Sequence, residues 1–480
     1  MQRSTKIVAT LGPASNDSAT LERLVAAGVN MVRMNFSHGT AQDHMDRAEL
    51  VREAARKANS PLAVMVDLQG PKIRVRKFED GKVDLVNGDK FILDAEYDGL
   101  GNQQVVGLDY KELPNDVEAG AILLLDDGRI VLEVTEVLGS EVHTRVKVGG
   151  ILSNNKGINR QGGGLTAPAL TAKDMEDIKV AAVLRADYVA VSFPKSGADM
   201  YMARTLLRAA GSKALLIAKI ERTEAIGNLE EILDASDGIM VARGDLAVEV
   251  GDAAVPALQK KMIKAARRKN KLTITATQMM ESMITSPVPT RAEVSDVANA
   301  VLDGTDAVML SAESASGKFP VETVEAMARI CLEAEKSQEN RISDEVLKQG
   351  DFTRIDQSIA MAALFAAGHL KVKAIAALTQ SGASALWLSR FISGVPVYAL
   401  TPEADTYARL ALFRDVYPFI MSYDNANQES LLVRAELELI QRGVVQQGDL
   451  VVFTYGDVVG LGGSTNSLKI VKVGERRTAR

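Results

Sequence analysis

The sequence predicts an α/β protein built on an eight-stranded (β/α)₈ barrel, and three observations support this fold class. Short apolar runs rich in β-branched residues alternate with segments of helical periodicity, which is the pattern of parallel βα units. Eight such runs can be counted, the number that closes a barrel of parallel strands. One long interval between the third and fourth runs has a different texture, which indicates a domain inserted into a barrel loop.

The eight predicted strands are short apolar runs, and helical stretches such as the capped SDVANAVLDG follow them. The predicted strands are Lys6–Leu11, Met31–Phe36, Leu62–Leu68, Tyr188–Phe193, Leu215–Ile220, Gly238–Arg243, Leu272–Thr277 and Ala307–Leu310. We therefore predict a barrel domain in two pieces, residues 1–70 and 169–345.

The interval 71–168 has the composition of a small β domain. It contains VDLVNGDKFIL, GAILLLDDGRIVLEVTEV and EVHTRVKVGG, which alternate in polarity and carry turn signals such as Asp127-Gly128. We predict a small β-barrel lid at the end of the barrel where active sites lie.

A polar linker around Lys336–Asp351 then leads to a third domain, residues 346–480. There VKAIAALT, VPVYALT, VYPFIM, DLVVFTYG and SLKIVKV predict a C-terminal α/β sheet domain.

Composition limits the class of protein. The 480 residues are 46% hydrophobic and 25% charged, and the net charge of −6 disfavours nucleic acid or an acidic membrane as the main partner. Cys331 is the only cysteine and cannot form an intrachain disulfide, and no apolar run has the length of a membrane span. With no signal segment before the first strand, we expect a cytoplasmic protein.

Polar residues gather at the carboxyl ends of the predicted strands, where barrel enzymes carry their catalytic groups. They are Arg33, Asn35 and Ser37 on the second strand, Asp67 on the third, Lys219 and Glu221 on the fifth, Arg243, Gly244 and Asp245 on the sixth, Thr277 on the seventh, and Ser311 and Glu313 on the eighth. Any one of these could be a structural ion pair. Convergence of six strand ends on one mouth favours an active site.

The chemistry of this set suits a metal and a phosphate. Glu221 and Asp245 come from adjacent strands, and two carboxylates completed by substrate oxygens and water are typical of Mg²⁺, with Mn²⁺ as the alternative. Lys219 lies on the same strand face as Glu221 and would neutralise charge on a transferring group. The alternative for Lys219 and Glu221 is a simple salt bridge. Amides around Gly244 could hold a carboxylate.

Longer motifs then resemble a known family. AKIERTEAIGNLEEILDASDGIMVARGDLAVEVG and ATQMMESMITSPVPTRAEVSDVANAVLDGTDAVMLSAESASGKFP are similar to the signature stretches of the pyruvate kinases. TLGPAS, MVRMNFSHG, DLQGPKIR and KGIN agree as well, so the resemblance runs from about Lys6 to the C-terminus.

The resemblance implies phosphoryl transfer between phosphoenolpyruvate and ADP, giving pyruvate and ATP. It implies that Arg33 and Lys219 contact the phosphoryl group, that Gly244, Asp245 and Thr277 hold the carboxylate, and that Glu221 and Asp245 bind magnesium. It also implies a nucleotide site formed by Asn35, Ser37, His38, Arg74 and Lys156. Thr277 would order a proton relay to the enolate. For His38 the alternative is a cap of the next turn.

Potassium-dependent members hold that ion with side chains matching Asn35, Ser37 and Asp67 and a carbonyl matching Leu68. For Asp67 the alternative is a hydrogen-bond acceptor at the barrel mouth. Those members typically read DTKGPEIR where this chain has DLQGPKIR, so Lys72 replaces a glutamate. An ammonium there could supply the charge that potassium brings, and we predict activity without K⁺; the alternative is a solvent-facing lysine. Ala247 replaces a glycine usual in the family, a change we expect to be tolerated.

In the third domain, two loops predict an effector site. TQSGAS (Thr379, Ser381, Gly382 and Ser384) opens a helix, and GLGGSTN (Gly462, Gly463, Ser464 and Thr465) supplies a second glycine-hydroxyl loop. The alternative for the first loop is an ordinary serine N-cap. The resemblance favours a phosphorylated allosteric activator, either a sugar monophosphate, a bisphosphate or AMP, and a homotetramer.

Two other functions compete. A metal-dependent lyase or aldolase acting on an enolate would share Lys219, Glu221 and Asp245 but would not need the lid, Arg74 or Lys156. A non-enzymatic metabolite sensor predicts loss of the lysine or of the metal carboxylates, and all three are present.

Overall fold

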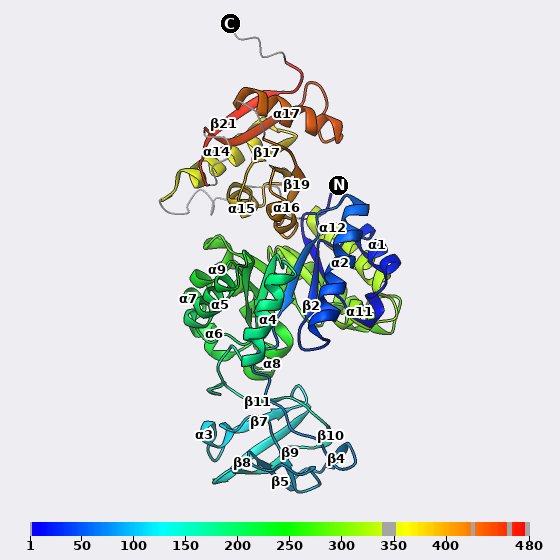
Figure 1. Ribbon diagram of the computed structural model, residues 1–480, viewed down its shortest axis with the longest axis vertical. Coiled ribbons are helices and arrows are strands. Elements are labelled where there is room, and N and C mark those ends of the chain that lie inside the picture. The colour runs from blue at the N-terminus through cyan, green and yellow to red at the C-terminus, as the bar shows by residue number, and fades with distance from the viewer. Residues whose placement is uncertain (1, 338–351, 424–427, 458–462, 476–480) are drawn as a thin grey trace.

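The computed structural model describes residues 2–337, 352–423, 428–457 and 463–475, and Gly462 and most of the predicted linker lie outside them. Three parts follow one another along the long axis of the molecule (Figure 1). The barrel lies in the middle, the inserted β part at one end, and the C-terminal part at the other.

The barrel is closed by eight strands, all paired in parallel, in the order β1-β16-β15-β14-β13-β12-β3-β2. Its strands are β1 (Lys6–Thr10), β2 (Met31–Asn35), β3 (Ala63–Asp67), β12 (Tyr188–Val191), β13 (Leu215–Ile220), β14 (Gly238–Ala242), β15 (Leu272–Ala276) and β16 (Ala307–Leu310). The predicted fold class is therefore confirmed.

Helices surround this barrel on the outside (Figure 1). They are α1 (Ser18–Ala26), α2 (Ala41–Ala58), α4 (Ala172–Val183), α5 (Gly197–Ala209), α6 (Thr223–Gly227), α7 (Leu229–Ala235), α8 (Arg243–Val250), α9 (Val255–Arg268), α10 (Arg291–Leu302), α11 (Ala312–Ala315) and α12 (Pro320–Lys336), with 3₁₀ turns at Pro13–Ser15, Asp252–Ala254 and Glu281–Ile284.

Capping boxes begin several of these helices. Thr40 with Asp43 begins α2, and Thr290 with Glu293 begins α10, because each hydroxyl accepts the amide of the third helical residue. The prediction for SDVANAVLDG was wrong at its start. Helix α10 begins at Arg291, ahead of this stretch, because Thr290 is the residue with an extended backbone and a free hydroxyl to cap it.

Several predicted strands also extend one or two residues too far at the carboxyl end. Strand β15 ends at Ala276 and β12 at Val191, because the backbone turns left-handed at Thr277 (φ 68°) and Phe193 (φ 55°). These turns, which β-branched and bulky residues rarely adopt, occur where the chain enters the barrel mouth.

The inserted part is a β structure around its own apolar core. A six-stranded sheet has the order β11-β7-β8-β9-β5-β6, and β10 pairs with β4. The elements are β4 (Lys82–Leu85), β5 (Lys90–Asp94), β6 (Val105–Gly107), α3 (Leu113–Asp116), β7 (Ile122–Leu125), β8 (Ile130–Leu138), β9 (Glu141–Val148), β10 (Gly150–Ser153) and β11 (Ile158–Arg160). Asp126 and Asp127, with φ near 50° and 57°, form the turn between β7 and β8.

The C-terminal part is a five-stranded sheet in the order β19-β18-β17-β20-β21, with β21 antiparallel. Its elements are α14 (Ile355–Leu370), β17 (Ala374–Leu378), α15 (Ala383–Ser389), β18 (Val397–Thr401), α16 (Ala404–Leu410), β19 (Val416–Ile420), α17 (Gln428–Gln441), β20 (Leu450–Gly456) and β21 (Thr465–Lys472).

The barrel interior and this C-terminal part share one apolar cluster, which contains Met31 and Met240 of the barrel and Leu364 and Leu412 of the third part. The two parts are therefore packed as a unit, and burial of shared apolar surface stabilises them together.

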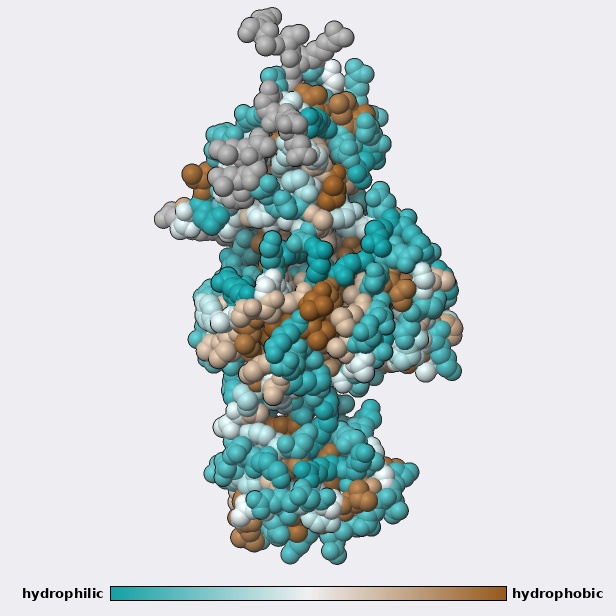
Figure 2. Space-filling view, in the orientation of Figure 1, coloured by the Kyte–Doolittle hydropathy of each residue, from teal (hydrophilic) through white to brown (hydrophobic). Residues whose placement is uncertain are grey.

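The surface of the inserted part is mainly hydrophilic in Figure 2, whereas apolar groups gather over the middle of the barrel. On α4 and α5, Met175, Val183, Tyr201 and Met202 are exposed. None of the helices in the described residues combines the length and the apolar character needed to cross a bilayer.

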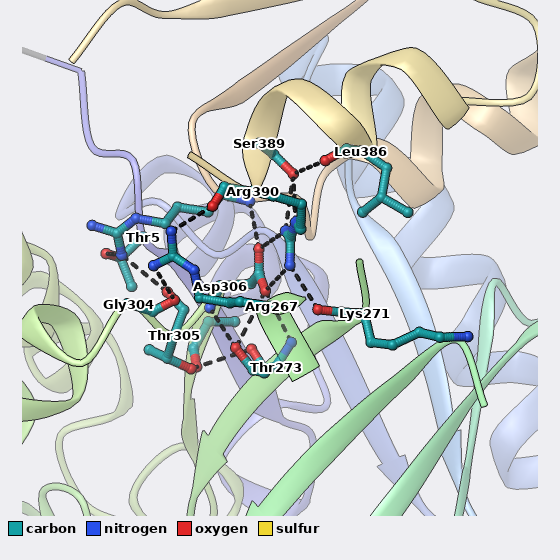
Figure 3. Close-up of polar contacts among 12 residues, drawn as sticks. Thr5, Arg267, Lys271, Thr273, Gly304, Thr305, Asp306, Leu386, Ser389 and Arg390 are labelled. Atoms are coloured by element: carbon teal, nitrogen blue, oxygen red, sulfur yellow. Dashed lines mark hydrogen bonds and ion pairs between the residues drawn. The ribbon is translucent and has the colours of Figure 1, made fainter. Parts of the chain in front are cut away.

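A buried ion cluster joins the C-terminal part to the amino end of the barrel (Figure 3). Asp306, directly before β16, pairs with Arg390, which follows α15, and both side chains are almost fully buried. Asp306 also accepts hydrogen bonds from the amides of Thr273 (2.9 Å) and Arg414 (3.2 Å). We call Asp306, Arg390, Thr273 and Arg414 the junction cluster.

Candidate active site

The barrel mouth that faces the inserted part contains a buried cluster of opposite charges centred on Lys219. Its ammonium lies 2.9 Å from Glu221 Oε1 and 3.3 Å from Asp67 Oδ1, and it donates a hydrogen bond to Ser192 Oγ at 2.8 Å. Both carboxylate side chains are only 1% exposed, and Lys219 is 11% exposed. We call Lys219, Asp67, Glu221 and Arg33 the mouth cluster.

Arg33 completes this cluster from β2. Its Nε donates to Asp67 Oδ2 at 2.6 Å and its Nη1 to Thr10 Oγ1 at 3.1 Å. Asp67 therefore accepts from two cations, which fits the interpretation of this residue as a hydrogen-bond acceptor at the mouth. Two cations held by one carboxylate are well placed to receive an anion.

The balance of burial and charge sets the protonation of the cluster. Burial raises the pKa of Glu221 to about 7, an effect that Lys219 opposes and Asp245 reinforces. Burial acts in the same direction on Asp67, but Lys219 and Arg33 outweigh it and lower that pKa. Burial would lower the pKa of Lys219, but Asp67 and Glu221 raise it, so the lysine remains a cation.

The adjoining wall of the site is the start of α8 and the turn after β15. The amide of Gly244 donates to Thr277 Oγ1 at 2.8 Å, and that hydroxyl donates to the carbonyl of Ala276 at 2.7 Å. Asp245 lies half-buried in the first turn of α8. The left-handed Thr277 is a strained position, of the kind that accumulates at active sites.

Arg243 holds this wall together. It donates to the carbonyl of Thr277 at 2.8 Å and pairs with Asp296 Oδ1 at 2.7 Å. Its guanidinium thus ties the start of α8 to the turn after β15. Glu313 has a similar structural part, because it accepts from the amides of Met280 and Ser311.

The carboxylates suit a hard divalent cation. Glu221 Oε1 is buried and, apart from the ion pair with Lys219, has no hydrogen-bond partner in the described part of the chain, while Oε2 accepts from the amide of Phe193 at 2.9 Å. Within the described residues no group of three or more His, Cys, Asp or Glu side chains could hold a metal. Two protein carboxylates, completed by substrate oxygens and water, fit magnesium rather than a cage built by protein alone.

The residues expected at the nucleotide are spread over the rim and the inserted part. Asn35 Oδ1 accepts from the Ser37 amide at 3.1 Å, and the exposed His38 offers its carbonyl to His44 Nε2 at 2.9 Å. Lys156 pairs instead with Asp126 inside the inserted part at 2.6 Å. Arg74 is half-buried, and its amide donates to Asp109 Oδ1 at 2.7 Å.

The expected monovalent-cation region lies beside the mouth cluster. The carbonyl of Leu68 already accepts from Ser192 Oγ at 2.7 Å. Lys72 is exposed, and its Cε lies against Gly157, 3.5 Å from where a β-carbon on that glycine would sit.

Sequence reasoning missed two hydroxyls at the mouth. Ser192 links Lys219 to Leu68, and Thr10 supports Arg33. Ser192 directly follows β12, so the rule that polar groups at strand ends carry function would have found it. Thr10, the last residue of β1, carried the same signal.

The two loops predicted for an effector meet around one pocket in the C-terminal part. Thr379, Ser381 and Ser384 line it from the loop after β17, and Gly463, Ser464 and Thr465 line it from the second loop; the cavity measures about 30 Å³. Ser384 Oγ is buried with no hydrogen-bond partner among the described residues, whereas Thr379 Oγ1 accepts from the Gly382 amide at 2.9 Å.

A barrel whose mouth combines cations, two carboxylates for a metal and an inserted domain has the features of an enzyme that transfers a charged group. Comparison with known proteins defines the class further. Residues 2–324 match the family model described as the barrel domain of pyruvate kinase, and residues 357–471 match its alpha/beta domain.

Named relatives agree. Pyruvate kinase II of Salmonella typhimurium is 53% identical over 98% of this chain and 99% of its own length. Pyruvate kinase of Haemophilus influenzae is also 53% identical, over 95% and 96%. A crystal structure of a pyruvate kinase from Cryptosporidium parvum superposes with a TM-score of 0.93 at 32% identity, covering 98% of this chain and 96% of that one. The chain belongs to the pyruvate kinase family, and the enzyme is a transferase.

Proposed function

We propose that the mouth cluster carries phosphoryl transfer from phosphoenolpyruvate to ADP, which makes pyruvate and ATP in the last step of glycolysis. The observation that supports this best is the position of Lys219, a cation held between Asp67 and Glu221 at the mouth of the barrel. The P–O bond to the enol oxygen breaks, and a new P–O bond forms to the terminal phosphate of ADP. Lys219 and Arg33 neutralise the charge of the group in transit.

The carboxylate of the substrate would bind at the start of α8, where Gly244 has no side chain to block the approach. The enolate that remains is protonated at its methylene carbon. Thr277 is too weak an acid to donate that proton alone, and its hydroxyl already donates to the Ala276 carbonyl. It would instead order the group or water that delivers the proton.

Pyruvate kinases generally depend on Mg²⁺, and Glu221 with Asp245 would hold it here; Mn²⁺ would fit the same oxygen ligands. When bound, the cation supplies positive charge to the phosphoryl and enolate oxygens. Asn35, Ser37 and His38 on the rim and Arg74 and Lys156 on the inserted part would bind the nucleotide. Lys156 would exchange its partner Asp126 for the ADP phosphates as the lid closes.

The first experiment measures pyruvate release from phosphoenolpyruvate, ADP and Mg²⁺, with and without K⁺. We expect turnover in both buffers, because Lys72 would supply positive charge near Asn35, Ser37, Asp67 and the Leu68 carbonyl. A strong stimulation by K⁺ would contradict the role given to Lys72 while leaving the kinase intact. Absence of turnover in both buffers, with folded protein, would contradict the function.

A charge reversal sharpens this test. Lys72→Glu should create a requirement for K⁺, with a stimulation of about tenfold or more, because a carboxylate there would attract the ion. Lys77→Glu, at another exposed lysine of the inserted part, is the matched control and should not respond to K⁺.

A phosphorylated activator is proposed for the pocket of the C-terminal part. Its described lining includes hydroxyls and glycine amides but no lysine or arginine, so a single phosphate suits it better than a bisphosphate. Activation by a sugar monophosphate, by AMP and by a sugar bisphosphate should be compared. Ser384→Ala should raise the activating concentration about tenfold without changing the basal rate, because it removes the unpartnered hydroxyl. An unchanged response would contradict this site, and Ser358→Ala on α14 is the control.

Homotetramer formation is the family's usual state, and exposed apolar residues on α17 (Val433, Leu437 and Ile440) would favour an interface in the C-terminal part. We also place the enzyme in the cytoplasm, where glycolytic substrates occur. Light scattering of the purified chain tests the oligomeric state.

A further inference from the structure

Three consecutive glycines mark the point where the chain returns from the inserted part to the barrel. Gly162, Gly163 and Gly164 follow β11, and all three are left-handed, with φ of 81°, 80° and 93°. Only glycine adopts such a run at low cost and leaves it easily. Rotation of the inserted part at this crossing would therefore cost little.

A carboxylate from the barrel holds this glycine segment. Glu224 lies on α6, three residues after Glu221 along the chain, and its Oε1 accepts a hydrogen bond from the Gly164 amide at 2.6 Å. The backbone of Gly163 packs closely against the same carboxylate. A β-carbon added to this glycine would lie only 2.8 Å and 2.9 Å from the two carboxylate oxygens. The segment from the proposed metal ligand Glu221 to Glu224 thus contacts the three glycines, which we call the hinge, directly.

Helix α8, which carries the second proposed metal ligand, Asp245, contacts the same glycines. Glu249 on α8 offers its carbonyl to the Gly162 amide at 3.1 Å, and its Oε2 accepts from the Thr223 amide at 2.8 Å. The other oxygen of Glu224, Oε2, is buried and accepts no hydrogen bond from any residue that the structure describes. A buried acceptor with no partner is costly, so this oxygen does not stabilise the fold, and we look to positioning for its role.

The chain is held on each side of the glycines. Before them, the Gln161 amide donates to the Ile122 carbonyl of the inserted part at 3.0 Å. After them, the Leu165 carbonyl accepts from Arg222 Nη1 of the barrel at 3.1 Å, and the Thr166 amide reaches back across the glycines to Asp116 Oδ2 at 2.8 Å. Among the described residues, the one side-chain hydrogen bond to the glycine amides themselves comes from Glu224.

We propose that Glu224 is a positioning residue that sets the pose of the inserted part over the barrel mouth through the Gly164 amide. The inference rests on the proposed placement of the nucleotide on Arg74 and Lys156. Without the Glu224 anchor, the inserted part samples a wider range of poses, and the nucleotide meets its residues less often. Phosphoenolpyruvate, which is bound by barrel residues alone, is affected much less.

Substitutions at position 224 separate this role from a structural one. Glu224→Ala should raise the KM for ADP about tenfold while the KM for phosphoenolpyruvate changes by less than about twofold, since loss of one charge-assisted hydrogen bond has about that effect on an equilibrium. Glu224→Gln keeps an acceptor for the Gly164 amide and should recover most of the ADP affinity. Glu231→Ala removes a bond of the same kind, in which Glu231 Oε1 accepts from the Gly197 amide outside the glycine segment, and should change neither KM.

A pair of glycine substitutions tests the contact from the other side. Gly163→Ala and Gly162→Ala share the strain of a left-handed alanine, but only the methyl at 163 meets the Glu224 carboxylate; nothing lies within 4 Å of a β-carbon at 162. Gly163→Ala should raise the KM for ADP as much as Glu224→Ala does. The double variant Gly163→Ala with Glu224→Ala should have a KM for ADP no higher than that of either single variant. Equal defects in the two glycine variants would overturn the inference, because stiffness of the hinge would then explain both.

A distance measurement follows the pose itself. Cys331 is buried, so spin labels can be placed selectively on cysteines introduced by Glu136→Cys in β8 and Val288→Cys on the barrel. Glu224→Ala should broaden the distribution of distances between the labels, and Glu224→Gln should restore it. An unchanged distribution together with an unchanged KM for ADP would overturn the role of Glu224. Loss of turnover in the parent chain would instead overturn the proposed function, because the distance distribution does not depend on catalysis.

Discussion

The two ends of the barrel each bury a cluster of opposite charges, and the clusters differ in how completely their atoms are satisfied. In the junction cluster, both oxygens of Asp306 are fully engaged by Arg390, by the amides of Thr273 and Arg414, and by the Thr273 hydroxyl. In the mouth cluster, Glu221 Oε1 has the ion pair with Lys219 and, within the described ranges, no hydrogen-bond donor.

Burial and shape sharpen the contrast. Asp306 and Arg390 side chains are 2% and 3% exposed and lie between the barrel and the C-terminal part (Figure 3). The mouth cluster opens towards the inserted part, and Lys219 retains some contact with solvent. A complete set of hydrogen bonds makes the junction cluster a structural element, whereas the incomplete set at the mouth agrees with the metal and phosphoryl binding proposed there.

Loss of the central cation at the mouth should give the largest effect. Lys219→Met should lower kcat about 10⁴-fold, because it removes the charge that neutralises the transferring phosphoryl group. Stability should change by less than about 2 kcal/mol, since Asp67 keeps its bond to Arg33 and Glu221, whose pKa burial raises to about 7, can take up a proton. Steady-state turnover and thermal unfolding measure the two quantities.

The matched control is Lys271→Met, at the amino end of the barrel, where the ammonium donates to the Ser236 carbonyl. It should keep turnover within about threefold of the parent, as expected for a residue outside the site. A Lys219→Met enzyme with near-normal turnover would remove the distinction between the two clusters.

The junction should show the opposite pattern. Asp306→Asn removes the carboxylate that compensates buried Arg390, and we expect a loss of about 3–5 kcal/mol in unfolding free energy with turnover per folded molecule largely kept. The single tryptophan, Trp387, lies on α15 three residues before Arg390, so its fluorescence reports on this region during unfolding.

The double variant Asp306→Leu with Arg390→Met supplies the control. Replacing both charges by apolar groups should recover most of the stability, because no buried charge is left unpaired. Failure of the double variant to recover would mean that the junction depends on the hydrogen bonds to Thr273 and Arg414 rather than on the ion pair.

The barrel could be predicted from the sequence because its signal is local and repeated. Eight apolar runs with helical stretches between them need no long-range information, and the strand ends located Arg33, Asp67, Lys219 and Glu221 by the same logic. The errors at strand ends arose at Phe193 and Thr277, where the chain turns left-handed in a way that no propensity favours.

The remaining features are long-range and leave no periodic trace. Asp306 and Arg390 are 84 residues apart in the chain, and Glu224 and Gly164 are 60 apart. Each pair is a single contact between a common charged residue and a partner fixed only by the folded topology. Ser192 was missed for a different reason: the predicted strand ran to Phe193 and placed the serine inside it, whereas β12 ends at Val191.

Strain at the mouth provides a smaller test of the comparison. Thr277→Gly should stabilise the protein by about 1 kcal/mol, because glycine accepts a positive φ without the penalty of a branched side chain. It should also lower kcat about tenfold or more, because it removes the hydroxyl that accepts from Gly244. A variant that is both more active and more stable would contradict a functional reason for the strain.

The smallest expected effects come from the hydroxyls that support each cluster. Ser192→Ala removes a hydrogen bond to Lys219 and should lower kcat/KM for phosphoenolpyruvate about tenfold while unfolding free energy changes by less than about 1 kcal/mol. Thr273→Val removes the hydroxyl bond to Asp306 at nearly constant shape and should cost about 1 kcal/mol of stability with no change in kcat/KM. Ser192→Ala is thus expected to change kcat/KM and not stability, and Thr273→Val to change stability and not kcat/KM. If both variants changed stability and activity together, the two ends of the barrel would be energetically coupled through the strands, and the division into a structural and a catalytic cluster would not hold.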